Sequence, residues 1–216
     1  MPDIYVHHRV TAEPRQWKAL ADALRITGAA RLAERQGALF GIWRSQIGRP
    51  RDELAVITVW PDEASAAKAE TLLLHGQPAV RACESERMTP TLRPSDPAPP
   101  RRQGNYAFRW FETPAGHWQE FLDLCAGAWP GFEAAYDSQV VGLWRSLDDD
   151  GSVRRSLLMT RRPDLAMWER SKIPAGEAEA EVRRKLSRRY DLCDWTLVYT
   201  TTLLTADDRE DTARWA

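Results

Sequence analysis

The chain has 216 residues, of which 43% are hydrophobic and 28% charged, a balance that is typical of one or two globular domains and excludes a disordered chain. Its 30 basic and 31 acidic side chains nearly cancel, so we expect no nucleic-acid partner and no membrane surface partner. Three widely spaced cysteines exclude a disulfide scaffold, and no apolar run approaches the roughly 20 residues of a membrane span. We therefore expect a cytoplasmic protein.

The first half of the chain predicts the element order β-α-β-β-α-β. Trp17, Leu20 and Leu24 recur at helical spacing, and turn-forming residues at 48–52 separate two β-rich runs, which indicates a hairpin. The expected elements are a strand at 4–10, a helix after Pro14, strands at 38–45 and 54–60, a helix at 61–74 and a strand at 85–92.

The second half repeats the first at a constant offset. Trp17 and Trp118 are 101 positions apart, as are Trp43 and Trp144. Because tryptophan is rare, two such pairs at one offset indicate an internal repeat. The remaining matches are Tyr5 with Tyr106, Gly41 with Gly142, Arg44 with Arg145 and Ser45 with Ser146. The expected elements of this half are strands at 106–111, 139–146, 155–161 and 196–204, and helices at 114–125 and after Pro163.

A proline-rich segment separates the two copies and favours an extended spacer. We expect a first module at residues 1–92, a linker at 93–103, a second module at 104–206 and an acidic, loosely docked tail at 207–216. Late in the second module, Glu179 with Arg183 and Glu181 with Lys185 have the i,i+4 spacing of a solvated helix face.

The element order of each copy is that of the ferredoxin-like unit, an antiparallel sheet with helices on one face. The fold class is therefore α+β. The uncovered sheet faces are buried most simply by packing sheet against sheet, as a pseudo-two-fold α/β barrel of two tandem ferredoxin-like modules. Such a fused pair permits a monomer, and a homodimer is the alternative.

The strands of Tyr5 and Tyr106 and the run of residues 41–48 resemble the dimeric α/β-barrel superfamily, and within it the NIPSNAP branch. That branch typically carries a Tyr-Glu-Leu-Arg-Thr-Tyr-type first strand and a Gly-x-aromatic-x-Ser/Thr-x-x-Gly second strand, in two tandem modules. This sequence departs from the pattern, because Val6 and Ala107 replace the glutamate. In the first copy His8 also replaces the arginine, which Arg109 retains in the second.

Strand alternation indicates which side chains share a face. We expect Phe40, Ile42, Val141 and Leu143 to face the helices, and the family parity then places His8 and Arg109 on the opposite face. The candidate catalytic residues are His8 and Arg109, and the candidate ligand-binding residues are Trp43, Ser45, Phe111, Trp144 and Ser146. The alternative is that Trp43 and Trp144 only fill a core. No HExxH motif or local Cys/His cluster occurs, so no metal site is expected.

Three functions remain open. The resemblance implies an enzyme without an organic cofactor, a monooxygenase, isomerase or cyclase that acts on a small hydrophobic, aromatic or polyketide-like molecule. His8 would be its general base and Arg109 would stabilise the oxyanion. Haem binding is the second function, with His8 or His117 as the axial ligand. The third is a non-catalytic ligand-binding or interaction protein, which the missing glutamates favour.

Overall fold

The computed structural model describes residues 3–208 and divides into two compact units. Unit 1 comprises Met1–Thr89, Asp96–Gln103 and Thr201–Ala216, and unit 2 comprises Pro90–Ser95 and Gly104–Thr200. Most of the expected acidic tail, residues 209–216, lies outside the described residues. The module boundaries given above stay predictions.

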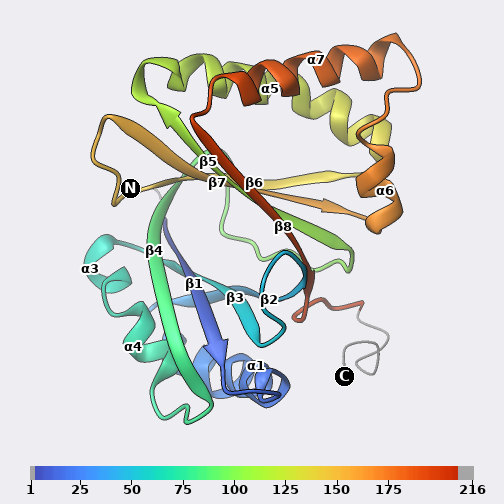
Figure 1. The fold of residues 1–216 in the computed structure, drawn as a ribbon. Coiled ribbons are helices and arrows are strands. Elements are labelled where there is room, and N and C mark those ends of the chain that lie inside the picture. Colours follow the sequence, from blue (N-terminus) through green and yellow to red (C-terminus); the bar gives the residue numbers. More distant parts are fainter. Residues whose placement is uncertain (1–2, 209–216) are drawn as a thin grey trace. The chain divides into compact units, whose positions relative to one another are not determined.

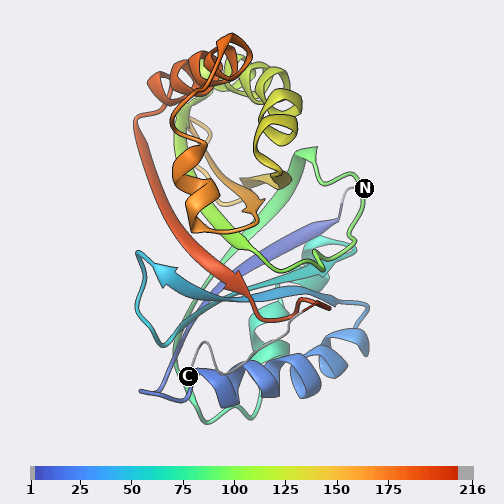
Figure 2. The same cartoon turned by 90° about the vertical axis from the view of Figure 1, so that its right-hand side faces the viewer.

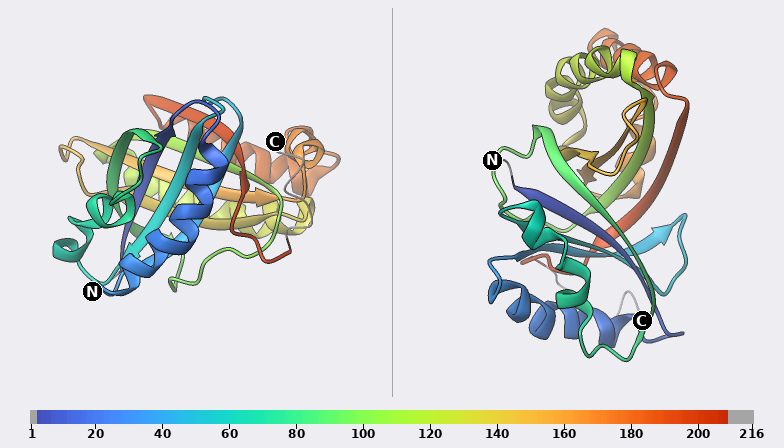
Figure 3. Two further views of the ribbon diagram at one scale, coloured as in Figure 1. Left: turned by 90° about the horizontal axis from the view of Figure 1, so that it is seen from below. Right: turned by 90° about the vertical axis from the view of Figure 1, so that its left-hand side faces the viewer.

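Unit 1 contains a sheet whose strands are ordered β4-β1-β3-β2, with antiparallel neighbours. The helical segment of residues 17–33 runs along one face of this sheet (Figure 3). The elements are β1 (Ile4–Ala12), α1 (Trp17–Ala23), the π-helical η1 (Leu24–Gly28), α2 (Ala29–Ala33), β2 (Ala38–Ile47), β3 (Glu53–Trp60), α3 (Glu63–Ala66), α4 (Ala69–Leu74) and β4 (Val80–Arg93). Each expected strand and helix is therefore present (Figure 1).

Unit 2 repeats the order, with the sheet β8-β5-β7-β6. Three helices cover one face of this sheet (Figure 2). The elements are β5 (Asn105–Pro114), the 3-10 turn η2 (Ala115–His117), α5 (Trp118–Tyr136), β6 (Gln139–Ser146), β7 (Val153–Arg162), α6 (Leu165–Arg170), α7 (Glu177–Asp191) and β8 (Trp195–Leu203). The helix α5 continues eleven residues beyond Cys125, where the sequence placed its end, and stops at Asp137 in the left-handed conformation (φ 41°).

Two strands contribute to both units. The Oγ1 of Thr91, near the end of β4, donates a hydrogen bond to the carbonyl oxygen of Leu143 in β6 (2.8 Å). After β8, the amide of Leu204 donates to the carbonyl oxygen of Ile42 in β2 (2.7 Å). The hydrogen-bonding order of the eight strands, β1-β3-β2-β8-β5-β7-β6-β4, is therefore closed. The α+β class and a closed antiparallel strand order are confirmed, whereas the packing of one module on the other stays a prediction.

The repeated Gly-x-Trp motif has a packing cause. A Cβ atom at Gly41 would overlap the indole ring of Trp43, and one at Gly142 would overlap that of Trp144. Because residues i and i+2 lie on the same face of a strand, each indole covers the glycine that precedes it by two positions. Both tryptophans are fully buried. The Gly-x-Trp match between the two copies is thus explained by packing within each sheet.

The second helical segment of each unit begins in the same way. Asp62 accepts a hydrogen bond from the amide of Ser65 at the start of α3, and Asp164 accepts one from the amide of Met167 at the start of α6 (both 2.7 Å). Each aspartate caps a helix N-terminus that would otherwise leave a donor unsatisfied. Among residues 3–208, no helix is long and apolar enough to cross a membrane.

Candidate functional site

Strand pairing decides which predicted site residues share a face in unit 2. Residues directly opposite each other in an antiparallel pair lie on the same face. Arg109 is opposite Leu158, which is opposite Leu143, and Leu143 packs in a core cluster with residues of α5. Arg109 therefore faces the helices, as does Phe111 two residues later. Trp144 is opposite Leu157 and lies on the other face.

In unit 1 the same argument places His8 against the helices. His8 is opposite Val56, which is opposite Ile42, and Ile42 lies beside Trp17 of α1. The prediction that His8 and Arg109 lie on the sheet face away from the helices was therefore wrong. The family pattern indicated the wrong face for alternate side chains of the first strands. Pairing through the neighbouring strands to Ile42 and Leu143 gives the correct face.

The His8 imidazole is fully buried and bonded at both nitrogens. Its Nδ1 lies 2.8 Å from the Oγ of Ser85 and its Nε2 lies 3.1 Å from the Oγ1 of Thr58. Burial lowers the pKa of His8 to about 3, because the charged imidazolium loses its hydration. The ring is thus neutral at physiological pH.

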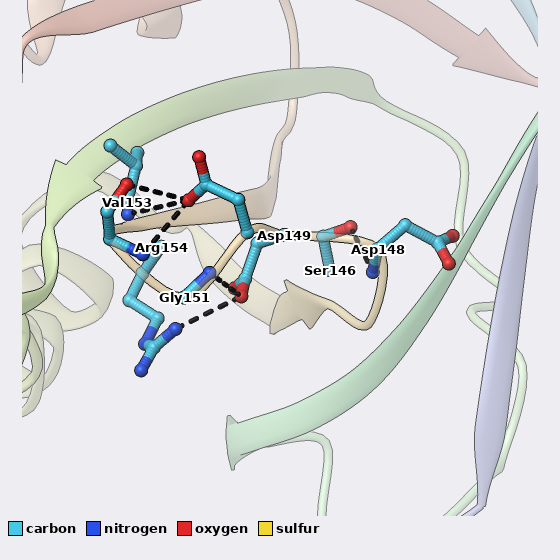
Figure 4. Close-up of polar contacts among 8 residues, drawn as sticks. Ser146, Asp148, Asp149, Gly151, Val153 and Arg154 are labelled. Carbon is cyan, nitrogen blue, oxygen red and sulfur yellow. Dashed lines mark hydrogen bonds and ion pairs between the residues drawn. The ribbon is translucent and has the colours of Figure 1, made fainter.

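The predicted ligand-binding serines lie at the ends of hairpin strands. The Oγ of Ser45 donates to the carbonyl oxygen of Arg49 (3.1 Å), and the Oγ of Ser146 accepts from the amide of Asp148 (3.2 Å). Figure 4 shows the second contact at the β6–β7 turn, where Asp149 accepts hydrogen bonds from the Gly151 amide and the Arg154 guanidinium. These contacts give the serines a structural role, and a role in ligand binding stays a prediction for both.

A cavity of about 480 Å³ lies between the sheet of unit 2 and the helices α5, α6 and α7. It brings together two of the predicted residues, Arg109 and Phe111. Its aromatic wall contains Phe111, Trp129, Phe132, Trp168 and Tyr190. A volume of several hundred Å³ is typical of a small-molecule site, and this lining is more polar than most, because half of its residues are polar or charged.

Five cationic side chains line this cavity: Arg109, Arg162, Lys172, Arg183 and Arg189. Asp191 is the only carboxylate of the described lining residues. Within residues 3–208, no carboxylate comes within ion-pair distance of any of the five cations. Arg162 and Arg189 are buried, Arg109 and Arg183 are half-buried and Lys172 is exposed. Because buried charges are ordinarily paired, the buried part of this cluster has an excess of positive charge that the described residues do not neutralise.

Aromatic rings and neutral acceptors hold these cations in place. The Arg162 guanidinium lies 5.0 Å from the centre of the Phe132 ring and donates to the Oγ1 of Thr160 (3.0 Å). The Arg189 guanidinium lies 4.9 Å from the centre of the Phe111 ring. A ring quadrupole attracts a cation without cancelling its charge. The side chains are therefore positioned but not neutralised.

Burial and repulsion by neighbouring cations lower the pKa values of Arg109, Arg162 and Lys172. The pKa of Arg162 falls to about 9, mainly because of burial and then because of Arg109 and Arg183. The pKa of Arg109 falls to about 10, mainly because of burial and then because of Arg189 and Arg183. The pKa of Lys172 is lowered in the same direction, with burial again the largest cause. An anion in the cavity would relieve this repulsion.

Four buried donors of lining residues have no hydrogen-bond acceptor among residues 3–208: the Nε1 atoms of Trp129 and Trp168 and the Nε atoms of Arg162 and Arg189. Buried polar groups are normally satisfied, and each exception calls for a cause. All four are donors that the surrounding side chains enclose, so they add to the electropositive character of the lining.

The sequence contains only a partial signal for this cluster. The charge run of residues 179–185 was expected to be solvated, yet Arg183 within it lines the cavity. Arg189, which follows that run, is only 7% exposed. Arg189 lies seven residues after Val182, so the two share a helix face, and Val182 belongs to the core cluster. That spacing could have identified Arg189. Arg162 had no comparable signal, because its inward direction depends on the register of β7.

Haem does not fit the cavity. Haem iron is held by His, Cys, Met or Tyr. The described lining has no His, Cys or Met, and Tyr190 is 57% exposed. The two histidines predicted as axial ligands, His8 and His117, are not lining residues.

No family model and no curated protein matches the chain. Solved structures do match. A monooxygenase-like protein from Lactobacillus acidophilus has a TM-score of 0.60 and 10% identity, with 95% of this chain and 98% of that chain covered. An anthrone oxidase-like protein has a TM-score of 0.59 and 13% identity, with 94% and 92% covered. A haem-binding protein from Thermus thermophilus has a TM-score of 0.55 and 13% identity, with 94% and 91% covered. Chlorite dismutases also match.

At these identities the likeness shows the fold alone. The neighbours are monooxygenase-like and chlorite dismutase-type proteins of the dimeric α/β-barrel type. That this chain belongs to their superfamily, and within it to the NIPSNAP branch, stays a prediction. What the chain shares with these neighbours is the fold.

Proposed function

We propose that the cavity of unit 2 binds an aromatic or polyketide-like small molecule that carries an ionised oxygen. The observation that carries this proposal is the group of five lining cations without a carboxylate in ion-pair range among the described residues. The aromatic wall matches a planar ring system. The monooxygenase-like and anthrone oxidase-like neighbours are consistent with such a substrate.

The same group of cations suits chemistry without an organic cofactor. A positive charge within about 4–6 Å lowers the pKa of an acid by about 1–3. Arg109 and Arg162 would therefore favour the enolate or phenolate form of a bound substrate over its neutral form. Monooxygenation, isomerisation and cyclisation of polyketide-like molecules can each begin from such an anion. Arg109 keeps its predicted role as the oxyanion stabiliser, whereas His8 is not a lining residue and has no part in this proposal.

Binding is tested with two probes that differ only in charge, 2-naphthoate and 2-naphthamide, by isothermal titration calorimetry. We expect the carboxylate to bind at least about tenfold more tightly than the amide, because a hydrogen-bonded charge pair contributes about 1.5–3 kcal/mol. Arg109→Met should reduce this preference, since one of the five lining cations is removed. Arg188→Met is the matched control, because Arg188 lies on α7 beside Arg189 but pairs with Glu120 and does not line the cavity. Equal affinities for the two probes in the wild-type protein would contradict the proposal.

Turnover is tested separately, by oxygen uptake with anthrone as the substrate and no added cofactor. We expect the protein to accelerate oxidation and Arg109→Met to lower kcat. If the carboxylate preference is found but no oxygenation, isomerisation or cyclisation is detected, the non-catalytic alternative is favoured and the enzymatic part of the proposal is refuted.

Haem, which the Thermus thermophilus neighbour binds, is the alternative that the lining of this cavity does not support. We expect a titration with haemin to produce no Soret band of unit stoichiometry, because the described lining residues lack an axial histidine, cysteine or methionine. A stoichiometric Soret band that disappears in the Arg109→Met variant would favour haem in this cavity instead.

A further inference from the structure

Unit 1 holds a cluster of three side chains of the kinds that bind metals. His8 is on β1, Glu70 is on α4 and Cys83 is on β4, and their ligand atoms all lie within 4.8 Å of one another. The sequence did not indicate this cluster, because the three residues are far apart in the chain and come from three different elements. Metal sites that a sequence motif reveals, such as HExxH, have ligands that lie close together in the chain.

The hydroxyl of Ser85 lies at the centre of this cluster. Its oxygen is 2.8 Å from Nδ1 of His8, 2.5 Å from Oε2 of Glu70 and 3.6 Å from Sγ of Cys83. One small oxygen therefore contacts all three ligand atoms. Because a serine hydroxyl moves by rotation about a single bond, this central position can be vacated without a change in the backbone.

The far side of the imidazole is arranged as a metal-bound histidine requires. The Nε2 of His8 lies 3.1 Å from the Oγ1 of Thr58, and this same oxygen accepts a hydrogen bond from the indole of Trp60 (2.8 Å). A hydroxyl oxygen can accept two hydrogen bonds. If Nε2 donates to Thr58, the lone pair of Nδ1 points towards the cluster. A hydrogen bond of this type fixes the tautomer of most metal-binding histidines.

We propose that unit 1 binds one divalent cation of the Zn²⁺ type through Nδ1 of His8, Sγ of Cys83 and the carboxylate of Glu70. Imidazole nitrogen, thiolate sulfur and carboxylate oxygen are the ligands that Zn²⁺ takes in proteins. Ser85 or a water molecule completes the tetrahedron. Three protein ligands with one exchangeable position are the composition of a reactive zinc site and not of a closed structural one.

The distances require a modest contraction. Bonds of about 2.0–2.3 Å to a tetrahedral ion place the ligand atoms about 3.3–3.8 Å apart, and the present spread reaches up to 4.8 Å. Glu70 is exposed and its long side chain supplies the movement. The buried His8 remains fixed by Thr58. Glu70 and Cys83 lie towards solvent, so they also provide the entry path for the ion.

The proposal is tested by titrating tag-free, reduced protein with Co²⁺ and following the thiolate-to-cobalt charge-transfer absorption in the near ultraviolet. We expect one Co²⁺ per chain, displaced by Zn²⁺. Cys83→Ser should abolish the charge-transfer band, and Glu70→Gln should weaken binding at least about tenfold. Both positions are exposed or half-buried, so these variants should fold as the wild type does.

Cys193→Ser is the matched control, because Cys193 is also a half-buried free cysteine but lies in unit 2. This variant should keep both the band and the stoichiometry. The proposal is overturned if the wild-type protein gives no thiolate-to-cobalt band, if Cys83→Ser keeps the band, or if Cys193→Ser loses it.

Discussion

Arg162→Met should stabilise the ligand-free protein, although it removes a side chain that makes a hydrogen bond. The pKa of Arg162 is about 9 instead of its ordinary 12.5, a difference of about 3.5 that corresponds to about 5 kcal/mol at 1.36 kcal/mol for each pKa unit. At pH 7 the group is charged in both the folded and the unfolded protein, so this cost of burying the charge is fully present.

The substitution removes that cost and also removes two favourable contacts. The hydrogen bond to Thr160 contributes about 1 kcal/mol and the contact with the Phe132 ring about 1 kcal/mol. A net gain of about 2–3 kcal/mol remains. For a chain of this length it should raise Tm by about 5–10 °C.

The assay is differential scanning calorimetry of dialysed, ligand-free protein at pH 7 and pH 10. The gain should shrink at pH 10, because Arg162 of the folded wild type has then lost its proton while that of the unfolded chain has not. Arg161→Met is the control, since Arg161 is next to Arg162 on the opposite face of β7 and does not line the cavity. A Tm at pH 7 below that of the wild type would refute the interpretation of the cluster as an unneutralised charge.

Three further predictions concern packing and protonation. Gly142→Ala should lower the free energy of unfolding in urea by about 1–3 kcal/mol, because its Cβ would overlap the indole of Trp144. In the control Gly116→Ala, the new Cβ meets nothing within 4 Å, so the free energy of unfolding should change by less than about 0.5 kcal/mol. The pKa of Glu179 is lowered from 4.5 to about 2, and the hydrogen bond from Arg170 is the largest cause. The Tm difference between the wild type and Glu179→Gln should therefore be largest above pH 5 and vanish as pH falls towards 2; a difference independent of pH would contradict this. Finally, the affinity for 2-naphthoate should fall as pH rises through 9–10, where the cavity arginines with lowered pKa values lose their charge; a constant affinity up to pH 11 would show that these arginines do not bind the carboxylate.

The element order could be predicted from the sequence because it depends on local signals. The spacing of hydrophobic residues predicts the helices, and the turn-forming residues predict the hairpins. The tryptophans repeated at one offset indicate that the second half repeats the first. The orientation of individual side chains could not be predicted with the same success. Phe40 was expected to face the helices, but a bulge between Leu39 and Gly41 changes the register and Phe40 instead packs against Tyr5, with ring centres 5.4 Å apart.

The candidate site was identified in part, and for a partly wrong reason. Arg109 was singled out from the family pattern, and the structure places it in a cavity, yet on the helix face of its sheet. The cations that surround it come from β7, from α7 and from the residues that follow α6. Of these arginines only Arg189, at helical spacing from Val182, differs in the sequence from a surface arginine. Only the packing of α7 on α5 and the register of β7 turn them inwards.

Binding of an oxygen anion on an aromatic molecule by the cations of unit 2 can be seen directly in a crystal structure of the protein with 6-bromo-2-naphthoate. The anomalous signal locates the bromine and hence the ring. We predict the ring inside the cavity against its aromatic wall, and the carboxylate within hydrogen-bond distance of Arg109 and Arg162. A bromine located outside the cavity between the unit 2 sheet and the helices α5, α6 and α7 would contradict the account.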